Sequence, residues 1–317
     1  MNIPFINEQM IRSNISMPKA IELMELAFSE LSEKKAIIPI RTNMQMNHSN
    51  SLIMPVYSPS LDVYGVKIVS INPNNTLQNQ PLIHAVFQLM EATTGKPLAL
   101  FDAEYITALR TGAASGLASK LLSDPKSEIL AIFGAGKQSL FQIEAVCNVR
   151  NISKVLVYTR TASRPIPFIN DGRNIFSGSI ICTENQSLLS DADIICTATT
   201  SKTPVIFETN LKPHVHINGI GSYQADMSEI PNQLVANSSI IVDQKEACLK
   251  EAGDIIQAIN NGFISESDIY AELGKLINSN KIVKLQKKMT FFKSVGNAIQ
   301  DLYIAEYIWK KRKVLND

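Results

Sequence analysis

The sequence predicts an α/β protein that joins a parallel-sheet domain to a smaller mixed α+β unit. Between residues 128 and 243, short apolar segments alternate with helical segments, which is typical of βαβ units. Before residue 116, strand and hairpin patterns accompany a single amphipathic helix. A length of 317 residues is enough for two domains with buried cores.

The N-terminal part begins with a predicted amphipathic helix over 16–32. Ser16 is the expected N-cap, Pro18 lies in the first turn, and apolar residues recur at spacings of three and four. The turn sequence 93–96 separates the last two strands and indicates a hairpin. The predicted strands of this part cover 51–55, 64–71, 85–90 and 97–101.

A predicted helix over 104–122, which is rich in small residues, spans the boundary between the two parts. A last long helix over 294–313 lies beyond the alternation, and we expect it to return to the N-terminal unit. The predicted domains are therefore 116–293, and 1–115 together with 294–317. The predicted strands of the parallel sheet cover 128–133, 154–158, 193–197, 215–221 and 239–243.

Composition excludes several classes of protein. Apolar residues make up 45% and charged residues 19% of the chain, which is typical of a soluble globular protein and not of a disordered one. The net charge of +1 argues against nucleic acid as a partner. We expect no membrane span, because no apolar run approaches 18 residues, and no secretory signal at the start. Four cysteines without a CxxC spacing indicate reduced thiols and a cytoplasmic location, and the histidines suggest no metal site.

A glycine-rich turn follows the strand at 128–133 and opens a helix. Gly134 permits the tight turn, Gly136 lets the backbone approach a pyrophosphate, and Ser139 replaces the third glycine of the usual pattern. A tight turn without a ligand is the alternative. The context favours a Rossmann-type dinucleotide site.

The end of the next strand indicates which dinucleotide binds. An NAD site usually carries an acidic residue there, whereas this strand ends in Thr159, Arg160 and Thr161, with Arg164 nearby. Guanidinium groups bind a 2′-phosphate that a carboxylate would repel. NADP(H) is therefore preferred and NAD(H) remains possible, unless these arginines are merely surface residues.

Several motifs stand in order along most of the chain, and they are Arg41, Met54-Pro55, 65–67, 94–97, Phe101-Asp102, 109–115, 134–138, 219–222 and 293–296. In these motifs the chain resembles the ornithine cyclodeaminase/mu-crystallin family. The resemblance implies a Rossmann domain and a second domain, from the N-terminal part and the C-terminal helix, that binds substrate and forms a homodimer.

The resemblance assigns the substrate carboxylate to Arg41, Lys67 and Arg110. The cost of burying a cation without a partner supports this assignment. The partner of these cations is either an acidic residue of the chain or an anionic ligand. Lys67 is also a candidate catalytic proton source. For Ile220 and Val295, a place in the apolar core is the alternative to cofactor contact. The cofactor-binding residues implied are Arg110, Thr111, Gly134, Ala135, Gly136, Lys137, Gln138, Thr159, Arg160, Thr161, Thr197, Ala198, Thr199, Ile220 and Val295.

One position departs from the family. Ornithine cyclodeaminases carry a catalytic Asp where this chain has Tyr223; Asp226, three residues later, is a catalytic candidate or a helix cap. The departure disfavours ornithine deamination but leaves hydride transfer possible.

The predicted function is an NAD(P)H-dependent reductase of a small cyclic imino acid, such as Δ1-pyrroline-2-carboxylate or Δ1-piperidine-2-carboxylate, giving L-proline or L-pipecolate. The alternatives are an ornithine cyclodeaminase, an alanine dehydrogenase-like enzyme, and a non-catalytic NADP(H)-dependent binding protein.

Overall fold

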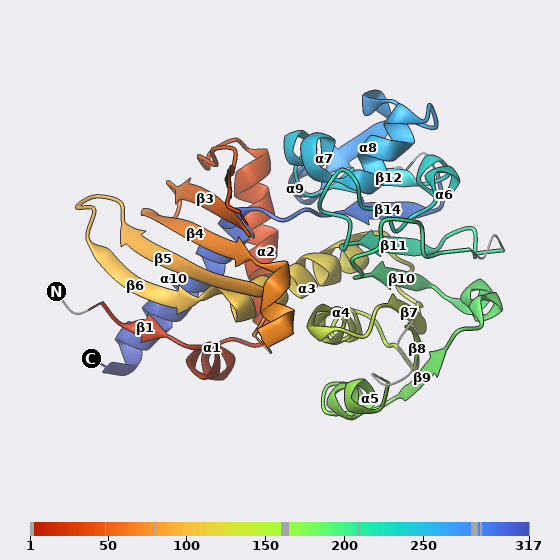
Figure 1. The fold of residues 1–317 in the computed structure, drawn as a ribbon, viewed down its shortest axis with the longest axis horizontal. Coiled ribbons are helices and arrows are strands. Elements are labelled where there is room, and N and C mark those ends of the chain that lie inside the picture. Colours follow the sequence, from red (N-terminus) through yellow and green to blue (C-terminus); the bar gives the residue numbers. More distant parts are fainter. Residues whose placement is uncertain are drawn as a thin grey trace. The chain divides into compact units, whose positions relative to one another are not determined.

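The computed structural model divides into two compact units, which are Met1–Arg110 with Gly296–Asp317 (unit 1) and Thr111–Val295 (unit 2) (Figure 1). Within these bounds it describes residues 3–47, 49–78, 80–159, 165–207, 210–279, 285 and 287–316. No helix within the described residues is both long and apolar enough to cross a membrane.

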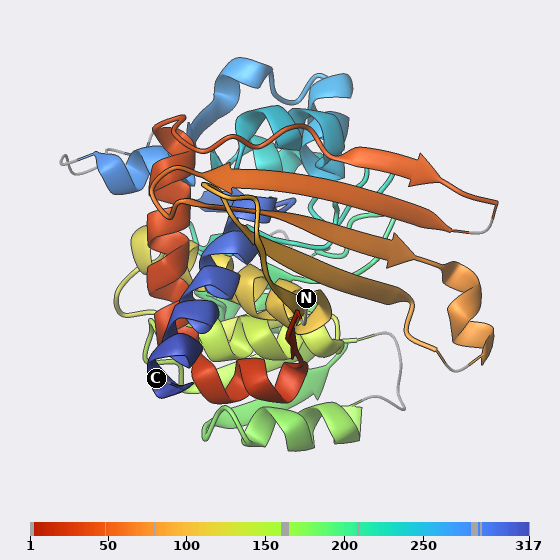
Figure 2. The ribbon, with the colours of Figure 1, turned by 90° about the vertical axis from the view of Figure 1, so that its left-hand side faces the viewer.

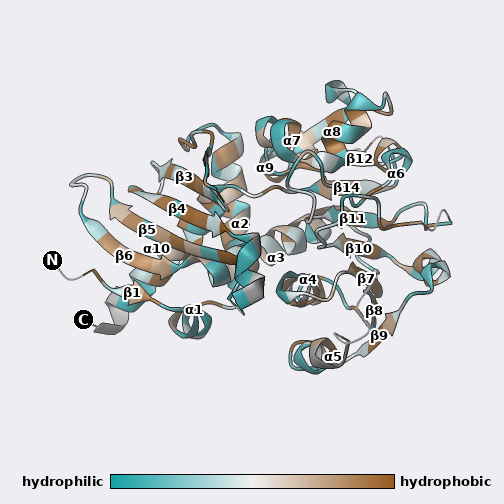
Figure 3. Cartoon of the chain, in the orientation of Figure 1, coloured by the Kyte–Doolittle hydropathy of each residue, from teal (hydrophilic) through white to brown (hydrophobic). Residues whose placement is uncertain are grey.

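Unit 1 is built on a six-stranded sheet in the order β1-β6-β5-β4-β3-β2. Within the described residues, β1 pairs in parallel with β6, and the other neighbouring strands pair antiparallel. The strands are β1 (Phe5–Ile6), β2 (Thr42–Gln45), β3 (Asn50–Ser58), β4 (Val63–Ile71), β5 (Ile83–Glu91) and β6 (Pro97–Asp102). Brown hydrophobic bands recur along β3 to β6 in Figure 3.

Helices α2 (Met17–Ser32) and α10 (Ala298–Asn316) lie side by side, and α10 packs against β3, β4 and β5 (Figure 2). The apolar residues of α2 that the spacing predicts, among them Met24 and Phe28, are fully buried. The remaining helical elements of this part are α1 (Glu8–Asn14), the 3₁₀ turn η1 (Pro73–Gln78) and α3 (Ala103–Leu122), which runs on into unit 2.

Unit 2 contains, within the described residues, an eight-stranded parallel sheet in the order β13-β12-β14-β11-β10-β7-β8-β9. Its strands are β7 (Ile129–Phe133), β8 (Lys154–Tyr158), β9 (Ser179–Thr183), β10 (Ile194–Thr197), β11 (His216–Gly219), β12 (Ser239–Val242), β13 (Ile269–Glu272) and β14 (Thr290–Lys293). The helical elements are α4 (Lys137–Cys147), α5 (Pro165–Arg173), η2 (Gln186–Asp191), α6 (Asn232–Ala236), α7 (Lys245–Glu251), α8 (Gly253–Asn260), η3 (Glu266–Asp268) and α9 (Leu273–Asn278).

The predicted fold class is confirmed, because a mixed sheet and a parallel sheet stand in the expected parts of the chain. The sequence analysis missed the short strands β1, β2, β9 and β13, and also β14, a buried strand of four residues between β11 and β12. It also began the last helix too early, because Gly296 has a φ of 75° and α10 starts only at Ala298. The functions that the sequence analysis gave to the two parts of the chain stay predictions.

Candidate functional site

A cluster of three cations and one carboxylate lies in unit 1. Lys67, in the middle of β4, is 1% exposed, and its Nζ lies 2.9 Å from Oδ1 of the fully buried Asp301 on α10. Burial lowers the pKa of Lys67 to about 8; Asp301 opposes this shift, whereas Arg110 and Arg41 add to it by charge repulsion. The charges of both arginines therefore act on Lys67, and an anion bound beside it would relieve this repulsion.

The segment that starts α10 holds the two arginines of this cluster. The guanidinium of Arg110 donates to Oε1 of Gln300 at 2.8 Å, and its Nε lies 3.8 Å from Oδ2 of Asp301. Arg41 donates to the carbonyl oxygen of Gly296 at 3.2 Å. Gly296 has a φ of 75°, which favours glycine, and a Cβ atom there would lie 2.2 Å from Nη1 of Arg110 and displace this guanidinium.

In unit 2, the glycine turn leads from β7 into α4 as predicted. Gly134 has a φ of 106°, and a Cβ there would lie 2.7 Å from the carbonyl oxygen of Ala198. Gly136 is the N-cap of α4, offers no capping side chain, and has open space where a Cβ would stand. Backbone N–H groups at such a helix start suit a phosphate, so the turn fits a dinucleotide.

A cavity of about 650 Å³ opens beside this turn. That volume lies in the usual range for small-molecule sites. Six of the predicted cofactor residues line it, namely Gly134, Ala135, Gly136, Thr159, Ala198 and Thr199. The sequence analysis did not anticipate the other lining residues, which include Thr183, Glu184, Gln186, Pro204 and Phe207.

Among the described residues, the remaining predicted cofactor residues fall outside the lining of this cavity. Thr197 is fully buried and donates its hydroxyl to Glu229 at 2.8 Å. Ile220 is 8% exposed and Val295 packs against the apolar core, while the carbonyl oxygen of Thr111 accepts from Gln142. Lys137 and Gln138 form the first turn of α4. Arg110 belongs to unit 1, and Arg160 and Thr161 lie outside the described residues.

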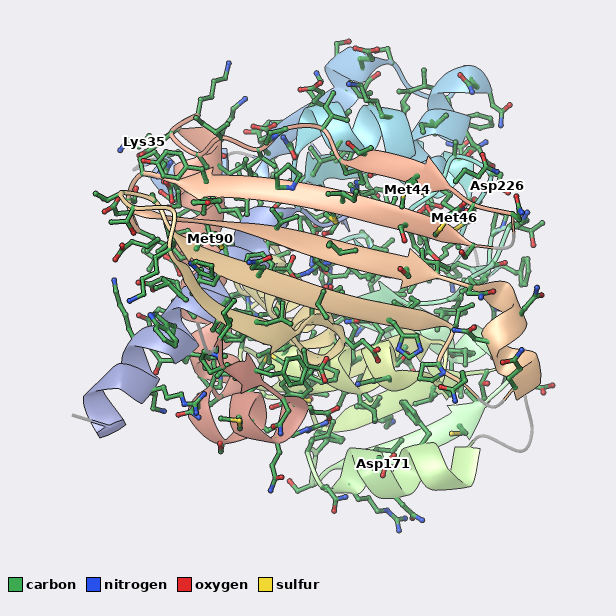
Figure 4. The ribbon with its side chains drawn as sticks, turned by 60° about the vertical axis from the view of Figure 1, so that its left-hand side comes forward. Lys35, Met44, Met46, Met90, Asp171 and Asp226 are labelled. Atoms are coloured by element: carbon green, nitrogen blue, oxygen red, sulfur yellow. The ribbon has the colours of Figure 1, made fainter. Side chains whose placement is uncertain are left out.

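Asp226, the predicted catalytic acid or helix cap, lies at the surface (Figure 4). Its side chain is 58% exposed and its carboxylate lies 2.7 Å from Nζ of Lys202, which lowers the pKa of Asp226. It caps no helix, because α6 starts at Asn232 with Pro231 as its N-cap. The nearby Tyr223 keeps its proton, since burial raises its pKa. Asp226 is thus an exposed carboxylate paired with Lys202, and its catalytic role stays a prediction.

Sequence reasoning missed Asp301, Gln300, Glu229 and Asp254, and it noted Lys293 only as part of the motif 293–296. Each is fully buried within its own unit, and each bonds to a neighbour far away in sequence. The one signal for Asp301 was an acidic residue among apolar ones near the start of a predicted core helix. Within the described residues, no group of three or more His, Cys, Asp and Glu could hold a metal ion.

Comparison with known proteins gives consistent matches along the whole chain. Residues 4–314 match the ornithine cyclodeaminase/mu-crystallin family. Over 310 residues, the chain is 37% identical to the Δ1-pyrroline-2-carboxylate reductase of Bacillus cereus (strain ATCC 10987 / NRS 248), covering 96% of this chain and 94% of that protein. It is 32% identical to the ketimine reductase mu-crystallin of Mus musculus, covering 94% and 93%.

Two solved structures match nearly the whole chain. The Δ1-pyrroline-2-carboxylate reductase of Thermococcus litoralis, in complex with NADH and L-proline, matches with a TM-score of 0.93 and 36% identity, covering 99% of this chain and 98% of that chain. An archaeal alanine dehydrogenase dimer with bound NAD matches with a TM-score of 0.92 and 29% identity, covering 100% and 98%.

A substitution at Gly136 tests the dinucleotide site. Asp is a favourable N-cap, so we expect Gly136→Asp to fold with an unchanged or raised melting temperature. Its carboxylate would compete with and repel a phosphate, so the affinity for NADH should fall by about tenfold or more. Titration of NADH fluorescence measures this, with Gly136→Ser as the uncharged control. Equal NADH affinity of Gly136→Asp and the wild type would contradict the assignment.

Proposed function

The chain belongs to the ornithine cyclodeaminase/mu-crystallin family, and from this premise we propose that it is an NAD(P)H-dependent reductase of a small cyclic imino acid. The favoured substrate is Δ1-pyrroline-2-carboxylate, reduced to L-proline, with Δ1-piperidine-2-carboxylate, reduced to L-pipecolate, as the larger-ring alternative. The observation that carries the proposal is the cation cluster of Arg41, Lys67 and Arg110 around the buried Asp301. It belongs to a chain whose relatives include reductases of this name.

The cation cluster would bind the carboxylate of the substrate. Arg110 already directs its guanidinium to Gln300 and Asp301, which fixes its plane for a two-point contact with a carboxylate. Arg41 is held at the carbonyl oxygen of Gly296. Binding an anion here compensates charges that are otherwise costly to bury, so a carboxylate gains affinity that a neutral ring lacks.

Lys67 is the residue that we propose as proton donor to the imine nitrogen. Asp301 accepts from its Nζ, which holds the ammonium in one place and favours its charged form. A pKa of about 8 keeps Lys67 protonated at neutral pH and still lets it release a proton readily. The bound dinucleotide would supply the hydride, and the chain contributes binding, orientation and the proton. We assign no step to Asp226.

For the coenzyme, we propose a preference for NADP(H), with NAD(H) also accepted. The absence of an acidic residue at the end of β8, where Thr159 stands, favours a 2′-phosphate. The exposed Glu184, which lines the cavity, adds a negative charge that works against a strong preference. Measuring turnover with both coenzymes decides between the two.

We further propose a cytoplasmic homodimer. The four cysteines are free thiols, which fits a reducing compartment. Lys67 points to α10, so its neighbour Ile68 points to the opposite face of the sheet and is 43% exposed. Met44, on β2, is 47% exposed on the same face, and it is labelled in Figure 4. Exposed apolar surface of this kind suits a second copy of the chain.

An assay of NADPH and NADH oxidation tests the function. We expect fast consumption with Δ1-pyrroline-2-carboxylate or Δ1-piperidine-2-carboxylate and none with ornithine and NAD⁺. Release of ammonia and proline from ornithine would instead support a cyclodeaminase. Activity with pyruvate and ammonia alone would support an alanine dehydrogenase. Nucleotide binding without turnover of any of these would support a binding protein.

The protonation of Lys67 predicts how binding depends on pH. Pyrrole-2-carboxylate keeps its charge between pH 6 and 10 and serves as an unreactive ligand. Its affinity should be constant below pH 8 and fall above it, towards about tenfold per pH unit, because deprotonated Lys67 removes one positive charge. Calorimetric titration measures this affinity. Lys67→Met should bind more weakly than the wild type below pH 8, with a flat profile towards which the wild-type affinity falls at higher pH. A flat wild-type profile would exclude Lys67 from the site.

A charge on the outer face of the unit 1 sheet tests the dimer. Ile68→Asp should yield monomers in light scattering, because an interface core excludes an unpaired carboxylate. Ile181→Asp, at a position of similar exposure on the edge strand β9 of unit 2, is the matched control and should remain dimeric. A dimeric Ile68→Asp variant would place the interface elsewhere.

A further inference from the structure

Glu229 lies in unit 2 on the segment between β11 and α6, and it is fully buried. Its backbone is fixed by Asp254, whose Oδ1 accepts from the N–H groups of Glu229 at 2.7 Å and Ile230 at 3.0 Å. The carbonyl oxygen of Glu229 also accepts from the N–H of Val205 at 2.8 Å. The side chain therefore starts from a firmly held backbone.

The carboxylate of Glu229 accepts three hydrogen bonds from two different loops. Oε2 accepts from the hydroxyl of Thr197 at 2.8 Å and from the N–H of Gly221 at 2.7 Å. Oε1 accepts from the N–H of Thr199 at 2.6 Å. The two loops follow β10 and β11, adjacent parallel strands whose carboxyl ends are where open α/β sheets bind ligands. Glu229 thus joins these strand ends through a single side chain.

Glycine at 221 shows how closely the two loops approach. A Cβ at Gly221 would lie 2.1 Å from the carbonyl oxygen of Thr199 and 2.5 Å from Oε1 of Glu229. On its other side, the first loop touches the glycine turn, where a Cβ at Gly134 would lie 2.7 Å from the carbonyl oxygen of Ala198. The loop 197–199 is therefore held between Gly134 and Gly221, and Glu229 sets its position.

A neutral side chain of the same shape cannot replace this carboxylate. Gln offers one acceptor oxygen and one NH₂ donor, so its NH₂ would face at least one of the donors that now bond to Glu229. Burial and the charge of Asp254 raise the pKa of Glu229, whereas Lys293 and the hydrogen bonds from Thr199 lower it. The hydrogen bonds require an acceptor at both oxygens, which the ionised form supplies.

We propose that Glu229 is a positioning residue for the dinucleotide, acting through the loops 197–199 and 219–222. It holds Ala198 and Thr199 in the wall of the cavity beside the glycine turn. It does not line the cavity itself, so its effect on binding passes through the loops. The inference rests on the dinucleotide site of the proposed function but not on the identity of the imino acid.

The test compares Glu229→Gln with Glu30→Gln. Glu30, in unit 1, is also buried and accepts hydrogen bonds from the hydroxyls of Ser58 at 2.8 Å and Tyr303 at 2.5 Å. It controls for the general cost of neutralising a buried carboxylate. Titration of NADH and NADPH fluorescence gives the Kd, calorimetry gives the melting temperature, and steady-state kinetics give the separate KM values.

We expect Glu229→Gln to raise the Kd and KM for the coenzyme by about tenfold or more, with the KM for the imino acid within about twofold of wild type. Glu30→Gln should lower the melting temperature without changing the coenzyme Kd. An unchanged coenzyme Kd in Glu229→Gln, or an equal rise in Glu30→Gln, would overturn the proposal.

A milder variant keeps the test decisive if Glu229→Gln does not fold. Thr197→Val removes one of the three donors and keeps the shape of a side chain that is fully buried. It should raise the coenzyme Kd about threefold, and an unchanged Kd would overturn the proposal. Because these titrations need no imino acid, an inactive but nucleotide-binding wild type would refute only the proposed substrate. A wild type that binds neither coenzyme would refute both.

Discussion

The buried ion pair between Lys67 and Asp301 is the interaction on which unit 1 depends. An ammonium group in the middle of a sheet would be costly without a partner, and breaking a buried pair costs about 3–5 kcal/mol. The partner comes from α10, at the far end of the chain. Docking of α10 on the sheet therefore completes both the core of unit 1 and the cation cluster. Gln300 accepts from Arg110 and Gly296 accepts from Arg41, and both belong to the segment that starts α10. Docking of this segment during folding therefore also assembles the cation cluster.

Unit 1 buries a cluster of cations, whereas unit 2 buries carboxylates near the carboxyl ends of its parallel strands. The carboxylates of Asp254 and Glu229 accept hydrogen bonds mainly from backbone N–H and hydroxyl groups. Nζ of Lys293 also lies 3.2 Å from Oδ2 of Asp254. In the middle of the sheet, β11 carries two buried polar side chains without charge, since Asn218 is neutral and burial lowers the pKa of His216 to about 3. Charge is thus concentrated at the strand ends, where the chain must hold loops against a ligand.

Sequence reasoning predicted the elements that have a local pattern of residues, and it missed the residues whose role depends on contacts with distant parts of the chain. Alternating apolar segments identified most strands, and the glycine turn after β7 was visible because its residues are contiguous. Arg110 and Lys67 were singled out as cations in apolar surroundings, but Asp301 was not, because its partner is 234 positions away. Asp226 attracted attention by its position in the sequence, yet its side chain lies at the surface with Lys202. Glu229, three residues after Asp226, is fully buried. No local sequence pattern distinguishes the buried Glu229 from the exposed Asp226.

The central claim is that the cation cluster recognises the carboxylate of the substrate. The most direct measurement compares kcat/KM for Δ1-pyrroline-2-carboxylate and for 1-pyrroline, which has the same ring without the carboxylate, in the wild type and in Arg110→Ala. The account predicts that the wild type prefers the carboxylate substrate by about a hundredfold or more, and that Arg110→Ala loses most of this preference with the Kd for NADH unchanged. An equal loss of activity on both substrates, or a preference that survives the substitution, would contradict it.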